Sequence, residues 1–271
     1  MTAQNRTQVW LDVLTQAPLT ELELPASIVV AKGVLADQQS AYFIGVKPDE
    51  NNPFPRARNG EVGLLEGWGL AKAVHWIIDQ DADQNHKTPI IAIVDVPSQA
   101  YGRREEALGI HLALAGAVGA YAQARQLGHP VIALLVGKAM SGAFLAHGYQ
   151  ANQIVALDDA SVMVHAMGKE SAARVTMRTI DQLEALSAKV PPMAYDIENY
   201  ASLGLLSGGL LQVQNIAQPS AEDSQKVLQH LTQCLEKTQQ DGTDLSNRLG
   251  SKNRSATARV KELMTAQWHA E

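Results

Sequence analysis

Runs of apolar residues separated by polar turns predict alternating strands and helices along most of the chain. Two strands joined by a polar turn are expected over 27–35 and 41–46, because both runs are rich in Val and Ile. Apolar residues at helical spacing over 64–78 predict a helix. The run 89–94 is continuously apolar, which is typical of a strand buried on both faces of a parallel sheet.

The alternation continues through the middle of the chain. The next expected elements are a loop over 97–104, an Ala- and Gly-rich helix over 105–126, a buried strand over 131–136, a turn over 137–141, a short helix over 142–149 and strands over 154–157 and 161–165. From residue 169 the pattern is mainly helical, with breaks at 191–192 and 207–209, a last strand over 210–216 and helices over 220–237 and 255–268. Strands that alternate with helices indicate a wound α/β core with crossover connections.

Length and composition favour one large core. The chain has 271 residues, of which 46% are apolar, and no low-complexity linker divides it into two parts. We therefore expect a single domain over 1–271, in which about 190–271 form a mainly helical C-terminal extension.

Charge and cysteine content exclude several classes of function. The net charge is −6 without a basic stripe, which argues against nucleic acid or an anionic membrane as a partner. The start of the chain lacks the pattern of a signal peptide, and no apolar run is long enough to span a membrane. The lone Cys234 permits neither a disulfide framework nor a cysteine zinc site, and it lies in an apolar helical pattern. These features predict a cytoplasmic protein.

Two segments share a design that could carry chemistry. In 90–117 and in 131–148, a buried strand ends, a Gly-containing turn follows, and a helix of small residues begins. The first backbone N–H groups of a helix have no intrahelical acceptor. One from each segment could converge on a single oxygen and form an oxyanion hole, with Gly109 and Gly142 allowing an acyl group to approach. Alternatively, Ala and Gly only permit tight packing of helices on the sheet.

The motifs themselves resemble a known superfamily. The VDVP strand end at 94–97, the Leu-Gly pair at 108–109 and the run KAMSGAFLAHG at 138–148 are similar to the carboxyltransferase branch of the crotonase superfamily. The resemblance covers about 60–215. Within that branch, the run 137–171 most resembles gamma subunits of biotin-independent malonate decarboxylases. The resemblance implies a crotonase/ClpP-like wound sheet with flanking helices.

The same resemblance implies a reaction and its partners. The chain would pair with a homologous beta subunit and release CO₂ from a malonyl thioester through an enolate, leaving an acetyl thioester. The substrate would be carried by an acyl-carrier (delta) subunit through its phosphoribosyl-dephospho-coenzyme-A arm, in a complex that includes an acyl-carrier transferase (alpha) subunit. The resemblance implies no metal and no cofactor bound directly.

The site residues also follow from the resemblance. It assigns the oxyanion donors to the backbone at Gly109 or Ile110 and at Gly142 or Ala143. Related carboxyltransferases often carry paired glycines at both places, whereas this chain has Leu-Gly and Ser-Gly. That departure leaves the individual donors open.

Several side chains are further candidates. A histidine could return a proton to the enolate carbon, although each could equally serve the fold and water could supply the proton; the candidates are His111, His147 and His165. Arg103 and Arg104 could bind a carboxylate or phosphate or form a solvated charge cluster. Lys138 could simply support packing at the turn.

Alternative functions remain open at this point. Ser141 and His165 lie 24 residues apart in segments that resemble the nucleophile turn and histidine strand of Clp-type peptidases, in which a Ser–His pair acts as nucleophile and base. No carboxylate stands at 212–215, where the third member of a triad is expected. A nearer rival is one half of a biotin-dependent carboxyltransferase. A third is a subunit that only completes the pocket of its partner.

Overall fold

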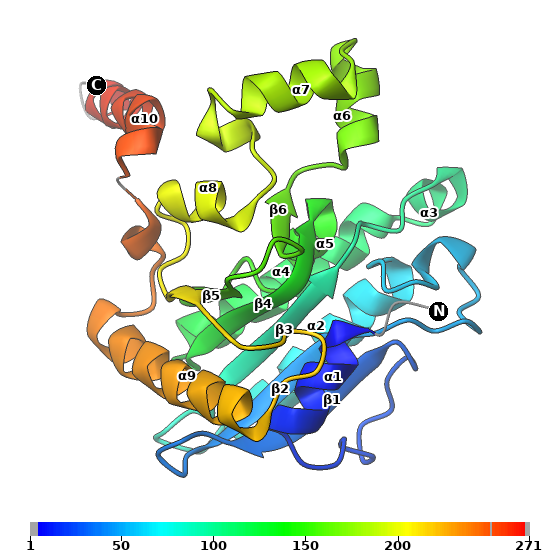
Figure 1. Cartoon of the computed structure of the whole chain (residues 1–271). Helices are drawn as coiled ribbons and strands as arrows, with labels where there is room; N and C mark the ends of the chain where they lie inside the picture. The colour runs from blue at the N-terminus through cyan, green and yellow to red at the C-terminus, as the bar shows by residue number, and fades with distance from the viewer. Residues whose placement is uncertain (1–4, 250, 269–271) are drawn as a thin grey trace.

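A twisted sheet with helices on both faces forms the centre of the molecule (Figure 1). The computed structural model describes residues 5–249 and 251–268. The sheet order is β1-β2-β3-β4-β5-β7, and β6 pairs with the end of β4. Among the pairs of named strands in the described residues, β1–β2 alone is antiparallel. The strands are β1 (Ile28–Val34), β2 (Ser40–Val46), β3 (Ile90–Val96), β4 (Val131–Met140), β5 (Gln153–Leu157), β6 (Met163–His165) and β7 (Gly209–Leu211).

The helices divide between the two faces of the sheet. In Figure 1, α1 and α9 cover the front face, whereas α2 and α4 lie behind the strands and pack on each other. Helices α6 and α7 stand above β6, and α10 lies away from the sheet. The α-helices are α1 (Arg6–Leu14), α2 (Leu64–Gln80), α3 (Arg103–Ala107), α4 (Ile110–Gln126), α5 (Ser141–Ala146), α6 (Lys169–Thr176), α7 (Ile180–Ser187), α8 (Ile197–Ser202), α9 (Ala221–Asp241) and α10 (Ser255–Trp268).

The predicted wound α/β core is confirmed. Every residue of β5 is buried, as are all but one residue of each of β3 and β4, because helices cover both faces of these strands. One hydrophobic cluster extends from Trp10 to Leu235 and includes Cys234. Burial raises the pKa of the Cys234 thiol to about 11, so this residue behaves as a small apolar side chain. The two ends of the domain expected over 1–271 lie outside the described residues.

The helix pair α2–α4 packs through glycines. A Cβ placed on Gly67 would come within 2.6 Å of the backbone of Ala113, and one on Gly116 would come within 2.7 Å of the Trp68 ring. Gly67 needs hydrogen as its side chain because the backbone of Ala113 lies so close, whereas the neighbour of Gly116 is the ring of the half-exposed Trp68. For this pair of helices, the small residues therefore serve packing.

The structure corrects the predicted boundaries around the two Gly-containing turns. The turn expected at 137–141 is wrong, because β4 continues to Met140 and α5 begins directly at Ser141. The helix expected over 105–126 is two helices, since Gly109 adopts a left-handed conformation (φ 81°) between α3 and α4. The helix expected over 142–149 ends at Ala146.

Two of the predicted strands are shorter in the structure. Only Met163–His165 of the strand expected over 161–165 and only Gly209–Leu211 at the strand expected over 210–216 are paired. Helix α1 was not predicted. It is held on the sheet by Trp10, whose indole N–H donates to the Ile216 carbonyl at 3.0 Å. Within the described residues, no helix is long and apolar enough to cross a membrane.

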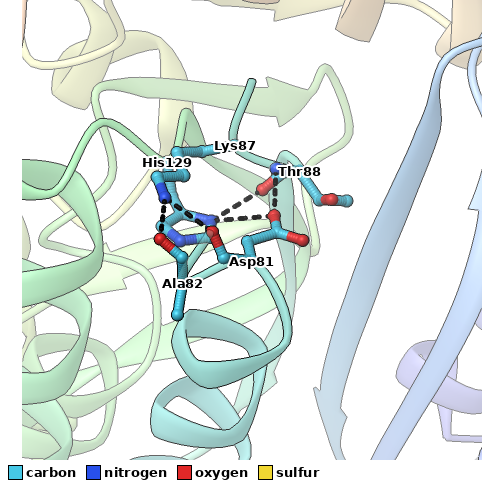
Figure 2. A network of polar contacts seen from close by, with 5 residues as sticks. All are labelled: Asp81, Ala82, Lys87, Thr88 and His129. Carbon is cyan, nitrogen blue, oxygen red and sulfur yellow. Dashed lines mark hydrogen bonds and ion pairs between the residues drawn. The ribbon is translucent and has the colours of Figure 1, made fainter. Parts of the chain in front are cut away.

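A network of polar contacts lies just before the amino ends of β3 and β4 (Figure 2). His129 Nδ1 lies 3.0 Å from the Thr88 carbonyl oxygen, and Lys87 Nζ donates to the Asp81 carbonyl at 2.6 Å. Burial lowers the pKa of His129, although the hydrogen bond to Thr88 opposes this. The network lies at the opposite edge of the sheet from the turns singled out above, so it belongs to the fold.

Candidate active site

The carboxyl ends of β3 and β4 meet at an irregularity that the VDVP motif creates. The β3–β4 register shifts between Val94 and Val96. The Lys138 N–H donates to Asp95 Oδ1 at 2.9 Å, which replaces a backbone acceptor at the shift. A Cβ on Gly137 would overlap the Asp95 carboxylate. The hydrogen bond to Asp95, and the lack of a side chain at Gly137, thus allow β4 to continue beyond the end of β3 up to the start of α5.

The first two residues of α5 form hydrogen bonds with Gln99, in the loop that follows β3. Ser141 has a positive φ of 52°, an uncommon conformation for a residue with a side chain. Its Oγ accepts a hydrogen bond from the Gln99 backbone N–H at 2.9 Å. The neighbouring Gly142 N–H donates to the side-chain oxygen of Gln99, Oε1, at 3.0 Å. The Ser141 hydroxyl therefore holds the backbone of Gln99, and the Gly142 N–H holds its side chain.

A cavity of about 800 Å³ opens in front of this contact. Its wall comes from the loop after β3, the β4–α5 junction, the segment after β6 and the chain around α8. Most of the lining is apolar, and Gln99, Ser141, Gly142 and His165 are among its polar or backbone-exposing members. The structure thus brings together Ser141, Gly142 and His165 from the residues that the sequence singled out.

The other expected backbone donors lie outside this cavity wall. The Gly109 N–H donates to the Glu106 carbonyl at 3.1 Å. The N–H groups of Ile110 and Ala143 have no acceptor within the described part of the chain, and both residues are buried. A Cβ on Gly142 would lie 3.3 Å from Leu114, one turn into α4, so the starts of α4 and α5 are close neighbours.

His147 is a structural residue. Its side chain is fully buried, with Nδ1 3.0 Å from the Tyr121 hydroxyl and Nε2 3.0 Å from the Ile93 carbonyl oxygen. Burial lowers the pKa of His147 to about 4, against a smaller opposing effect of the hydrogen bond to Ile93. A neutral imidazole whose two nitrogens are both engaged in the core does not supply protons to the cavity.

His165 lines the cavity without contacting Ser141. Its ring stacks on Tyr195 with centroids 3.8 Å apart, and Nδ1 lies 2.9 Å from the Met167 carbonyl oxygen. Burial lowers the pKa of His165, and the contact with Met167 opposes this shift. The hydrogen bond of Ser141 is with Gln99. A Ser–His hydrogen bond, which nucleophilic catalysis requires, is therefore not among the contacts of the described residues.

The remaining candidates lie on the surface. His111 and Lys138 are exposed, and the Arg104 guanidinium lies over the Phe54 ring, 4.8 Å from its centroid. Arg103 is exposed beside it. Gln99 is the site residue that sequence reasoning missed. The only signal for it was its place two residues after the VDVP motif.

The class of protein follows from the sheet order and the two strand–helix junctions. A transcarboxylase 12S structure shares the fold with a TM-score of 0.61 at 19% identity, over 87% of this chain and 42% of that one. The chain thus has a crotonase-like carboxyltransferase fold. The sequence profile described as malonate decarboxylase gamma subunit matches residues 57–268, and the chain belongs to this family. It is a subunit of a decarboxylase.

Individual relatives agree with that assignment. A Pseudomonas malonate decarboxylase hetero-tetramer in complex with coenzyme A contains a chain 57% identical to this one, with a TM-score of 0.92 over 97% of this chain and 99% of that one. In a Pseudomonas MdcD–MdcE hetero-dimer the identity is 55% and the TM-score 0.89, with the same coverage. The malonyl-S-ACP:biotin-protein carboxyltransferase MADD of Malonomonas rubra is 33% identical over 71% of this chain and 67% of its own length.

Proposed function

We propose that this subunit pairs with a homologous beta subunit and releases CO₂ from a malonyl thioester on an acyl-carrier (delta) subunit. The product is an acetyl thioester, the carrier arm is a phosphoribosyl-dephospho-coenzyme-A group, and the complex includes an acyl-carrier transferase (alpha) subunit. The hetero-dimer and hetero-tetramer of the Pseudomonas relatives support the pairing. The lone, buried Cys234 suits a reducing compartment, and we place the complex in the cytoplasm.

The chemistry needs stabilisation of one developing charge. When a malonyl thioester loses CO₂, the electron pair of the broken bond moves into an enolate with negative charge on the thioester oxygen, and a proton from water then converts the enolate carbon into the methyl group of the acetyl thioester. Hydrogen-bond donors that are already in place stabilise such a charge by several kcal/mol. We assign the donors to the neighbouring starts of α4 and α5. At α5 they are Gly142 or Ala143, and at α4 the choice between Gly109 and Ile110 falls on Ile110, because the Gly109 N–H donates to Glu106. No metal or directly bound cofactor takes part in this proposal.

One observation carries the proposal. At the wall of the cavity, the Gly142 N–H already donates to an amide carbonyl oxygen at 3.0 Å. A thioester oxygen is chemically similar to that acceptor, and it gains negative charge along the reaction. The lining is mostly apolar, and a hydrogen bond to a charged oxygen is stronger in apolar surroundings than in water.

Turnover by the reconstituted pair tests this function and separates it from its nearest rival. The gamma–beta pair is mixed with malonyl-loaded carrier, and release of CO₂ and formation of the acetyl carrier are measured with and without avidin. We expect turnover that avidin does not affect. If CO₂ release requires a biotinylated protein, as the name of the Malonomonas relative suggests for that enzyme, the chain is a carboxyltransferase half.

A further inference from the structure

The start of α5 holds the side-chain amide of Gln99 in place at the cavity wall. Oε1 accepts from the Gly142 N–H at 3.0 Å, and the Gln99 backbone N–H donates to Ser141 Oγ at 2.9 Å. Because an N–H group must face an acceptor, the first contact fixes which end of the amide is oxygen. The amide nitrogen, Nε2, therefore points away from Gly142.

The backbone of Gln99 is fixed from a third direction. The flanking residues pair with Val62: the Val62 N–H donates to the Ser98 carbonyl at 3.1 Å, and the Ala100 N–H donates to the Val62 carbonyl at 2.8 Å. A short parallel bridge between Val62 and Gln99 results. Backbone hydrogen bonds thus hold the main chain on both sides of Gln99. The position on the cavity wall from which its side chain extends is therefore fixed.

The free end of the amide is a pair of donors. Nε2 carries two N–H groups and has no acceptor within the described part of the chain, and Gln99 lines the cavity. A hydrogen bond to Oε1 polarises the amide and makes its N–H groups better donors. Donors of this kind, held before the reaction begins, are what a developing oxyanion needs.

We propose that Gln99 is a catalytic residue whose Nε2 donates to the enolate oxygen, and that Ser141 and Gly142 are positioning residues that hold it. The inference rests on the proposed decarboxylase function and changes the role of Gly142 within it. The Gly142 N–H, already engaged by Oε1, acts on the substrate through the Gln99 amide. The strained φ of Ser141 is explained in the same way, because it directs Oγ and the Gly142 N–H at one residue.

Two substitutions at Gln99 separate donation from structure. Gln99→Glu keeps an acceptor for the Gly142 N–H but removes both donors and adds a negative charge, and Gln99→Ala removes the whole amide. In the gamma–beta pair with malonyl-loaded carrier, we expect both to lower kcat about 100- to 1000-fold, the size typical of losing one oxyanion donor. The KM for the carrier and the elution of the complex should stay unchanged. Gln123→Ala, an exposed glutamine on α4, is the matched control.

Three other outcomes would each overturn the inference. Near-wild-type kcat in Gln99→Glu would show that only the contact with Gly142 matters. A higher kcat/KM in Gln99→Ala would show that the amide blocks the site and must be displaced. Loss of the complex in both variants, with a normal rate per intact complex, would make Gln99 a packing residue. The wild-type pair assayed in parallel reports on the proposed function itself: no CO₂ from wild type would contradict that function, whatever the variants do.

Discussion

At the scale of single residues, burial decides which of the polar side chains near the junction can take part in chemistry. His147 follows α5 directly, but its ring is enclosed between Tyr121 and the Ile93 carbonyl, and its pKa is lowered to about 4. Gln99 and His165 lie on the cavity wall instead. Position in the sequence does not distinguish these residues, whereas the direction of each side chain does.

The buried His147 predicts an acid-sensitive fold. Its pKa is about 4 in the folded chain against the usual 6.5, so the unfolded chain binds more protons between these values. The free energy of unfolding should therefore fall as the pH falls from about 6.5 to about 4, by on the order of 3 kcal/mol from this residue. Urea unfolding at several pH values measures it. His147→Gln should flatten this slope and the exposed His111→Gln should not; equal slopes in all three proteins would contradict the assignment.

Substitution of Ser141 distinguishes a decarboxylase from a serine peptidase. Its hydroxyl holds the Gln99 backbone, so Ser141→Ala should lose one hydrogen bond, about 1 kcal/mol, and lower CO₂ release less than tenfold. A peptidase would lose nearly all activity. Mass spectrometry after treatment with a serine-directed fluorophosphonate gives an independent check. Covalent labelling at Ser141 would reverse the order of the two functions.

At the scale of elements, small residues serve two purposes in different places. Gly67 and Gly116 allow α2 and α4 to approach each other, as the packing interpretation of the Ala- and Gly-rich helices requires. At Gly142 the atoms nearest to an added Cβ are those of Gln99 and Leu114, at the edge of the cavity. The packing interpretation therefore applies to Gly67, and the oxyanion interpretation of Gly142 stays a prediction.

The packing of α2 on α4 can be tested separately from catalysis. Gly67→Ala places a Cβ 2.6 Å from the backbone of Ala113, so the helices must separate. We expect the free energy of unfolding to fall by about 1–3 kcal/mol. Gly119→Ala is the control, because nothing lies within 4 Å of a Cβ there; it should raise stability by up to about 1 kcal/mol through helix propensity. If Gly67→Ala were as stable as Gly119→Ala, the close approach of these helices would be wrong.

Apolar runs were enough to predict the central strands and a parallel type of sheet, because β3, β4 and β5 are buried on both faces. The end of β4 could not be predicted. Gly137 and Lys138 look like a turn until Asp95, from another strand, provides the acceptor that extends β4. The contact between Gln99 and Gly142 was equally hidden, since 43 positions of sequence separate the two residues. Both features depend on a polar contact between residues far apart in the sequence, which a sequence pattern does not reveal.

At the scale of the whole molecule, the site opens beside exposed apolar side chains. Tyr101, Leu108 and Leu112, around the start of α4, are each more than half exposed. We expect the chain to form a hetero-oligomer with a beta-type partner, because a half-site needs its complement. Light scattering after size exclusion should show a larger, stoichiometric species when the two are mixed. A monomer of this chain with full turnover by itself would contradict partner dependence.

The central claim is that the start of α5 in this chain stabilises the enolate. The most direct measurement is the rate of CO₂ release by the gamma–beta pair that carries Gly142→Val, expressed per intact complex. A side chain there would displace Gln99 and crowd the acyl group, so we expect a fall of about 100- to 1000-fold, as for loss of one oxyanion donor. Carrier binding and complex formation should be retained, and Gly119→Ala should behave like wild type. A rate that falls only in proportion to lost complex would contradict the claim and place the oxyanion site in the partner subunit.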